Sequence, residues 1–196
     1  MGELKLSPLV YLDIVRHIQR FNNDIIPETD RKIVYGLVAG FVEDGVPNIT
    51  KFVPFTHTNS PLDFELNHDF FKFADKFNTD HHDPKYASDE ILGFVRSYPS
   101  ENIDYSNIDK KNLLYFQSGY NENAVLFALD PSSDQYTMQI KHFKASLLEL
   151  DESAELEDVP WNFGDVEDLD DLFKIVLQVA RNRDAKLPLI KEVNEK

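Results

Sequence analysis

Few groups of residues in this sequence have the types and spacing needed to bind a metal or attack a substrate. The chain has no cysteine, which excludes disulfides, thiolate zinc sites and a cysteine nucleophile. His81 and His82, followed by Asp83, form the only histidine pair. A catalytic zinc takes three protein ligands, and no third ligand stands at a recognisable spacing. We therefore interpret residues 81–83 as a polar loop rather than a metal site.

The remaining motifs for catalysis or phosphate binding are missing. The other histidines do not repeat at the i, i+4 spacing of a helical zinc site; they are His17, His57, His68 and His142. The chain has no Gly-x-Ser-x-Gly elbow for a serine nucleophile. Gly36 and Gly40 lack the Lys-Ser/Thr pair of a phosphate-binding loop.

The net charge of −15 comes mostly from one segment. Residues 145–173 contain 11 acidic residues and no Lys or Arg, and the rest of the chain carries 24 acidic and 20 basic residues. This balance speaks against nucleic-acid binding, which depends on cationic contacts. The acidic segment is either a solvated linker or a docking tail for a basic partner.

Apolar runs are too short for a membrane span of roughly 18–20 residues. The first residues also lack the apolar region of a signal peptide. We expect a soluble protein with no membrane partner, located in the cytoplasm, and we leave a nuclear location open.

The periodicity of apolar residues predicts an α/β domain with a mixed sheet flanked by helices. Ser7-Pro8 begins a helix, and a hairpin turn at Glu43-Asp44-Gly45 joins two strands. The first of these strands lacks alternation, so both of its faces should be buried. Pro54 places an edge or a bulge in the second strand. The predicted strands cover residues 32–41, 46–58, 90–95, 124–129 and 136–143, and two further helices cover 64–77 and 106–117.

The last 51 residues are expected to differ from this domain. We predict a domain over residues 1–145, then an acidic linker and a C-terminal amphipathic helix over 146–196. Apolar residues in that helix recur at helical spacing; they are Leu169, Leu172, Phe173, Val176, Leu177 and Ala180. This helix either packs on the domain or faces another subunit. The same two options apply to Val159-Pro160-Trp161-Asn162-Phe163, which could instead anchor a partner.

Two stretches resemble the MPN domain, the cytidine-deaminase-like fold of JAMM deubiquitinases and their inactive relatives. The first runs from Lys32 to Gly40, followed by Phe52-Val53-Pro54-Phe55. The second is Ile91-Leu92-Gly93-Phe94-Val95-Arg96-Ser97-Tyr98-Pro99, with Ser106-Asn107-Ile108-Asp109 after it. Asp130-Pro131 and the following strand also match, so the resemblance spans Leu4 to about Phe143.

The resemblance also shows which catalytic residues are replaced. In active members two His and one Asp bind zinc, a Glu on the early strand is the general base, and a Ser stabilises the oxyanion. Here the two His positions are Arg96 and Tyr98, and the Glu position is Ile33. Only Ser106 and Asp109 match. Arginine has no lone pair for a metal, and tyrosine is a poor ligand at neutral pH. We therefore expect a pseudoenzyme without a cofactor.

The two retained residues are expected to have structural roles. Arg96 is predicted to form an ion pair with Asp109, which places a guanidinium where a metal would sit. Ser106 is predicted to cap the helix that begins there.

The resemblance implies a non-catalytic scaffold that pairs with another MPN-domain protein, as a heterodimer or homodimer. Subunits of the proteasome lid, the COP9 signalosome and a translation initiation complex pair in this way. The predicted partner interface is Tyr11, Ile14, Val15 and Ile18 of the first helix with Leu172, Phe173 and Val176 of the last. Two alternatives remain open. One is an active isopeptidase with relocated ligands, using His81 or His82 with Glu90 or Glu101 as base. The other is a stand-alone module that binds ubiquitin, a ubiquitin-like protein or a peptide.

Overall fold

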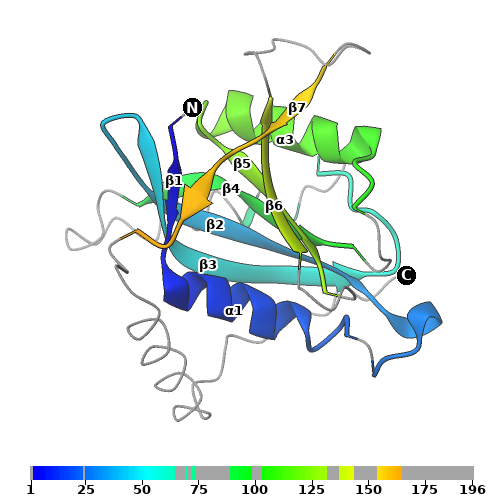
Figure 1. Ribbon diagram of the computed structural model, residues 1–196. Helices are drawn as coiled ribbons and strands as arrows, with labels where there is room; N and C mark the ends of the chain where they lie inside the picture. The colour runs from blue at the N-terminus through cyan, green and yellow to red at the C-terminus, as the bar shows by residue number, and fades with distance from the viewer. Residues whose placement is uncertain are drawn as a thin grey trace.

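In the computed structural model, the described residues are 2–23, 25–64, 69, 72–73, 89–98, 103–131, 137–143 and 154–164. They form an α/β fold in which a mixed, strongly curled sheet makes a half-barrel (Figure 1). The sheet has eight strands in the order β7-β6-β5-β4-β2-β3-β1-β8. The strands are β1 (Leu4–Leu6), β2 (Ile33–Glu43), β3 (Val46–Thr58), β4 (Glu90–Ser97), β5 (Val125–Asp130), β6 (Thr137–Phe143), β7 (Leu156–Asp158) and β8 (Trp161–Asn162).

Two α-helices, α1 (Pro8–Ile18) and α3 (Asn107–Gly119), accompany the sheet in the described part of the chain, with a short 3₁₀ helix at Glu28–Asp30. β2 pairs antiparallel with both β3 and β4, whereas β4 and β5 are parallel. Parallel neighbours need a long crossover, and α3 lies in the crossover between β4 and β5. The predicted mixed sheet with flanking helices is therefore confirmed.

The hairpin of β2 and β3 is the longest pairing in the sheet, and its turn follows from two residues. Asp44 and Gly45 both have positive φ, at 50° and 77°. Two consecutive positive φ values are typical of the tight turn that matches the twist of a hairpin. The register skips one residue of β3 near Pro54, because Tyr35 faces Thr56 and Gly36 faces Pro54. The predicted turn and the predicted bulge are both confirmed.

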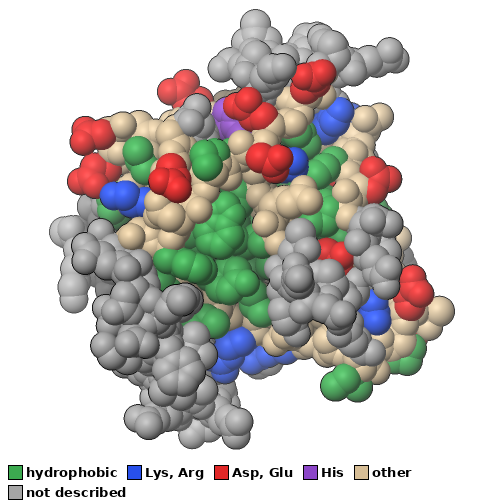
Figure 2. Space-filling model, in the orientation of Figure 1, with side chains coloured by type: hydrophobic (Ala, Val, Ile, Leu, Met, Phe, Trp, Pro, Cys, Tyr) green, Lys and Arg blue, Asp and Glu red, His purple; other side chains and the backbone are tan. Residues whose placement is uncertain are grey.

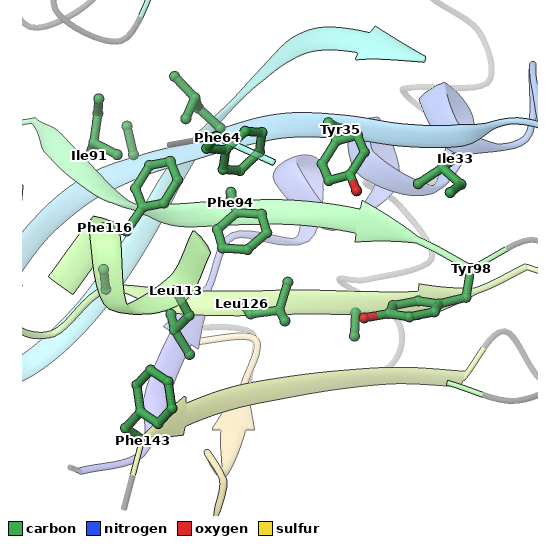
Figure 3. Packing of buried hydrophobic residues seen from close by; sticks show 14 of the residues in the cluster. Ile33, Tyr35, Phe64, Ile91, Phe94, Tyr98, Leu113, Phe116, Leu126 and Phe143 are labelled. Carbon is green, nitrogen blue, oxygen red and sulfur yellow. The ribbon is translucent and has the colours of Figure 1, made fainter. Parts of the chain in front are cut away.

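The two helices cover opposite faces of the sheet, and β2 contributes to both cores. Val34 and Val38 pack with Ile14 and other residues of α1. The alternate residues of β2 belong to the other core, which includes Phe116 of α3, and Figure 3 shows Tyr35 beside Phe64 in that core. Successive strand residues point to opposite faces, so a strand covered on both sides reads as a continuous apolar run. The predicted burial of both faces is confirmed.

Residues 154–164 add strands at both ends of the sheet. β7 pairs with β6, and β8 pairs with β1. The Leu4 amide donates to the Pro160 carbonyl at 2.8 Å, and the Val159 amide donates to the Ile140 carbonyl at 2.8 Å. Of the two interpretations of residues 159–163, packing on the domain is the one observed. Both strands follow the predicted boundary at residue 145, so the sheet uses chain from each side of it.

Several predicted elements lie outside the described residues. The loop at 81–83 and the C-terminal helix, with Leu172, Phe173 and Val176, are among them. Of the predicted helix over 64–77, the structure assigns a helical conformation to residues 69 and 72–73. Among the described helices, none has the length and apolar character needed to cross a membrane.

Candidate functional site

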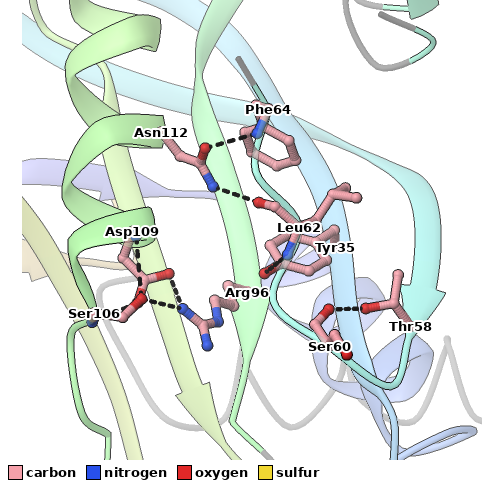
Figure 4. A network of polar contacts seen from close by, with 9 residues as sticks. All are labelled: Tyr35, Thr58, Ser60, Leu62, Phe64, Arg96, Ser106, Asp109 and Asn112. Atoms are coloured by element: carbon pink, nitrogen blue, oxygen red, sulfur yellow. Dashed lines mark hydrogen bonds and ion pairs between the residues drawn. The ribbon is translucent and has the colours of Figure 1, made fainter. Parts of the chain in front are cut away.

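A buried ion pair joins the end of β4 to the start of α3. Arg96 is 5% exposed and lies opposite Tyr35 in the β2–β4 register. Its Nη1 donates to Oδ1 of Asp109, which has no exposed surface (Figure 4). The predicted contact between Arg96 and Asp109 is therefore confirmed. A buried charge is costly without a partner, so each of these two groups requires the other.

Ser106 fixes the other side of the Asp109 carboxylate. The backbone amide and the hydroxyl of Ser106 both donate to Oδ2 of Asp109, each at 2.9 Å. In return the Asp109 amide donates to Oγ of Ser106 at 3.4 Å, which completes a capping box. The predicted cap is confirmed, and such caps contribute about 1 kcal/mol. Asp109 thus has one oxygen on Arg96 and the other on the helix start.

Three tyrosines surround the ion pair. The guanidinium carbon of Arg96 lies 4.4 Å from the ring centroid of Tyr98. Tyr98 meets Tyr105 edge to face at 6.1 Å, and the Tyr105 hydroxyl donates to Oε1 of Gln139 at 2.8 Å. The Tyr35 hydroxyl accepts a hydrogen bond from the Leu62 amide at 3.0 Å. Arg96 is therefore flanked by Tyr35 of the neighbouring strand β2 and by Tyr98 just beyond the end of its own strand, and Tyr105 of the approach to α3 packs on Tyr98.

The protonation states follow from this packing. Burial raises the pKa of Tyr35 to about 12, although the Arg96 charge opposes the shift. Burial also raises the pKa of Tyr98, and Asp109 adds to that effect. Burial lowers the pKa of Arg96, but Tyr35 and Asp109 more than offset it and the net shift is upward. At neutral pH Tyr35 and Tyr98 are therefore neutral and Arg96 carries its charge, so these tyrosines offer no phenolate to a metal.

Asn112 is a site residue that the sequence analysis missed. It lies one turn beyond Asp109 on α3 and is 1% exposed. Its side-chain amide donates to the Leu62 carbonyl at 2.8 Å, and its side-chain oxygen accepts from the Phe64 amide at 2.9 Å (Figure 4). The signal was present, since Asn112 stands next to Leu113 on the apolar side of the helix. A polar residue at such a position requires buried partners.

The structure brings the five predicted site residues to one region. Ile33 and Tyr98 belong to one buried cluster, and Arg96 contacts Tyr98, Ser106 and Asp109. The described part of the chain has no group of three His, Asp or Glu residues that could hold a metal. Ile33 offers no base, and both oxygens of Asp109 are engaged. Among the described residues, the arrangement holds the guanidinium of Arg96 on Asp109. It leaves no set of side chains available to coordinate a catalytic metal.

Of the residues proposed for relocated catalysis, Glu90 is the one that lies in the described part of the chain. Glu90 begins β4, six residues before Arg96, and is exposed. At roughly 3.3 Å per strand residue it lies about 20 Å from the ion pair. His81, His82 and Glu101 are outside the described residues.

The predicted partner interface on α1 needs a correction. Ile14 and Ile18 are 0% and 1% exposed, because both pack into the chain's own core on the sheet. Neither has surface to offer a partner. Tyr11 and Val15 are half-buried at the flank of the same helix, and they keep part of their surface.

Comparisons with known proteins match the fold and give no family. No protein-family profile matches the chain, and no curated protein matches its sequence. A solution structure of protein DSY2949 from Desulfitobacterium hafniense is similar to this chain, with 12% identity and a TM-score of 0.53. The match covers 81% of this chain and 91% of that one. At this identity the likeness concerns the fold alone.

Proposed function

We propose that this chain is a non-catalytic MPN domain, with the cytidine-deaminase-like fold of that family, that serves as a scaffold. The observation that carries the proposal is the buried pair of Arg96 and Asp109. In the resembling family both positions are zinc ligands, a His where Arg96 stands and the Asp that is retained as Asp109. A guanidinium held on Asp109 satisfies that carboxylate as a metal would, and it excludes a dication by its charge.

The surrounding residues support a structural role for the former metal site. Metal-assisted hydrolysis needs three ligands, an open position for water and a base that takes the proton. Here one carboxylate remains, and Arg96, Tyr98 and Ile33 stand at the other positions. The site then connects β4 to α3 and stabilises the domain instead of cutting an isopeptide bond.

The proposed partner is a second MPN-domain chain in a ubiquitin-, proteasome- or translation-related complex. The partner-facing surface of α1 consists of the side chains that the core leaves accessible. These include Tyr11 and Val15 at the flank and Leu9, which is 48% exposed. Apolar side chains on the outer side of a helix are typical of docking surfaces.

Zinc binding tests the assignment of the site. Isothermal titration of the wild-type chain with zinc should show no stoichiometric site, and a ubiquitin-dimer cleavage assay should show no product. The double variant Arg96→His/Tyr98→His restores the family's two histidines beside Asp109 and should bind one zinc per chain. Asp109→Asn in that background is the control and should abolish binding. Stoichiometric zinc on the wild-type chain together with isopeptide cleavage would contradict the proposal.

Affinity purification from native extract tests the scaffold role. A second MPN-domain chain recovered in comparable amount is the expected result, and that chain's own motif then shows whether the complex is catalytic. Recovery of ubiquitin alone, or of no chain, contradicts pairing.

A further inference from the structure

The outer side of α1 joins an apolar surface that continues onto β8. We call it the α1–β8 patch, and it consists of Leu9, Tyr11, Leu12, Val15, Trp161 and Phe163. Leu9 is 48% exposed, and the other five are half-buried. The buried side of α1 is formed by other residues, including Val10 and Ile14. This helix is therefore apolar on two sides, and only one of them rests on the sheet.

The aromatic residues of the α1–β8 patch pack together. Tyr11 stacks on Trp161 with centroids 6.2 Å apart, and Phe163 meets Tyr11 edge to face at 5.5 Å. Trp161 and Phe163 are 5.2 Å apart. Figure 2 shows hydrophobic side chains gathered on this side of the molecule, above α1 in the orientation of Figure 1, with Lys or Arg side chains at the lower border. A contiguous apolar surface of this kind generally has an occupant.

The chain itself continues from the edge of the α1–β8 patch. Gly164 is the last described residue, and its amide donates to Oδ1 of Asn162 at 2.7 Å in a turn with φ of 65°. Its neighbour Phe163 contacts Tyr11. Thirty-two residues follow Gly164, and residues 168–180 carry an apolar stripe at helical spacing. An apolar segment therefore starts a few residues from an apolar surface, at very high local concentration.

The charges of the two parts also favour packing of the tail segment on the α1–β8 patch. Residues 165–171 contain five acidic residues and no basic one. Lys5 lies beside Gly164, and α1 carries Arg16 in its last turn with Arg20 just beyond it. The segment is negatively charged, and the surface beside its starting point carries positively charged side chains. A helix over residues 168–180 would be about 20 Å long, close to the roughly 16 Å of α1.

We propose that the segment 168–180 folds back as an amphipathic helix and packs its apolar stripe on the α1–β8 patch of its own chain. The contacting side of the segment is Leu169, Leu172, Phe173 and Val176. This inference stands on the patch and the sequence of the tail, and it does not depend on the MPN assignment. Because the patch includes Tyr11 and Val15, a partner that binds α1 has to displace the segment first. The tail then regulates the pairing proposed above, and this consequence alone rests on the proposed function.

Trp161 reports on the patch directly, because it is the only tryptophan in the chain. In the full-length double variant Leu172→Asp/Phe173→Asp, the tail loses its apolar stripe. The Trp161 emission should shift to longer wavelength, and its acrylamide quenching constant should rise about twofold as the patch becomes solvated. Lys174→Asp changes the net charge by the same two units at a position off the stripe. This control should leave both signals at their wild-type values.

A variant on the patch side makes the test reciprocal. Leu9→Asp should produce part of the same change in Trp161, and combining it with Phe173→Asp should give less than the sum of the two effects. Both measurements accompany far-UV circular dichroism, so a variant that fails to fold is recognised. An unchanged Trp161 signal in the folded tail variant overturns the proposal.

Measurements at several protein concentrations distinguish packing of the tail on its own chain from packing on a second copy. If the tail of one chain covers the patch of another, the Trp161 signal changes with protein concentration and light scattering shows a dimer. That result overturns intrachain packing. A monomer with a concentration-independent signal, together with the response of the tail variant, supports it. The experiment uses the isolated chain, so its outcome is independent of whether an MPN partner is ever found.

Discussion

Asp109 and Asn112 lie one turn apart on α3, and each holds a different part of the domain. Asp109 binds Arg96 at the end of β4, whereas Asn112 hydrogen-bonds the backbone of Leu62 and Phe64. These two contacts fasten the crossover helix to the sheet and to the segment after β3. In the resembling family the same helix start carries a metal ligand. Here it carries the polar contacts of a structural clamp.

Replacing Asn112 tests the clamp. Asn112→Ala leaves the Phe64 amide and the Leu62 carbonyl without their partner in a buried place. Each unsatisfied buried group costs about 1–3 kcal/mol, so the free energy of unfolding should fall by at least that amount. Urea unfolding followed by circular dichroism measures it. Lys111→Ala, at the exposed neighbouring position, is the control and should change the stability by less than about 0.5 kcal/mol.

The ion pair should show strong coupling in a double-mutant cycle. Asp109→Asn keeps a polar cap at this position but leaves Arg96 as an uncompensated buried cation, which should cost about 3–5 kcal/mol. Arg96→Met alone leaves Asp109 with its contacts to Ser106 and should cost less. Combining the two should recover much of the loss, because no buried charge then remains. The free energies of unfolding from urea titrations provide the cycle, and additive effects would show that the pair is energetically unimportant.

Local sequence signals predicted most of the sheet. The positive-φ pair at Asp44 and Gly45, the Pro8 helix start and the apolar run of β2 all act through neighbouring residues, so their patterns are visible in the sequence. β7 and β8 were missed as strands because they are only three and two residues long and lie in an acidic, Pro-containing stretch. Their conformation depends on pairing with β6 and β1, which periodicity does not reveal.

Some of the site residues were predicted and others were missed, again because sequence patterns do not reveal contacts between distant segments. The Arg96–Asp109 pair followed from a resemblance that fixed two distant positions, and Ser106 followed from capping chemistry. Asn112 was missed because its partners are backbone groups of residues 62 and 64, about 50 positions away. The partner surface was partly wrong, since helical spacing groups Ile14 with Tyr11 and does not show which side rests on the sheet.

His17 should make the domain sensitive to acid. Its ring is 1% exposed, packs against Phe21 and Phe52, and neither of its nitrogens has a hydrogen-bond partner in the described structure. Burial lowers the pKa of His17 from 6.5 to about 4, and the charges of Arg20 on its own helix end and His57 on β3 add to the shift.

The sign of the effect follows from proton binding. Between about pH 6.5 and pH 4 the unfolded chain binds a proton on His17 and the folded chain does not, so stability falls with falling pH through this window. The slope from this group reaches about 1.4 kcal/mol per pH unit. Urea unfolding at several pH values should show a steeper loss for wild type than for His17→Leu. Parallel curves for the two proteins would exclude His17 as the cause.

Gly93 on β4 should not tolerate a side chain, and Gly119 provides the matched comparison. Gly93 has a φ of 136°, a region that side chains disfavour, and a Cβ there would overlap the carbonyl oxygen of Val125 on β5. Gly93→Ala therefore combines backbone strain with displacement of the parallel neighbour, and about 3 kcal/mol or more of stability should be lost.

At Gly119, the end of α3, the nearest atom to an added Cβ is on the Tyr115 ring at 3.6 Å. Gly119→Ala should be neutral or stabilising by up to about 1 kcal/mol, because it restricts only the unfolded chain. Thermal unfolding of the two variants beside wild type measures both effects, and equal losses at the two positions would show that the close approach of β4 and β5 does not limit residue 93.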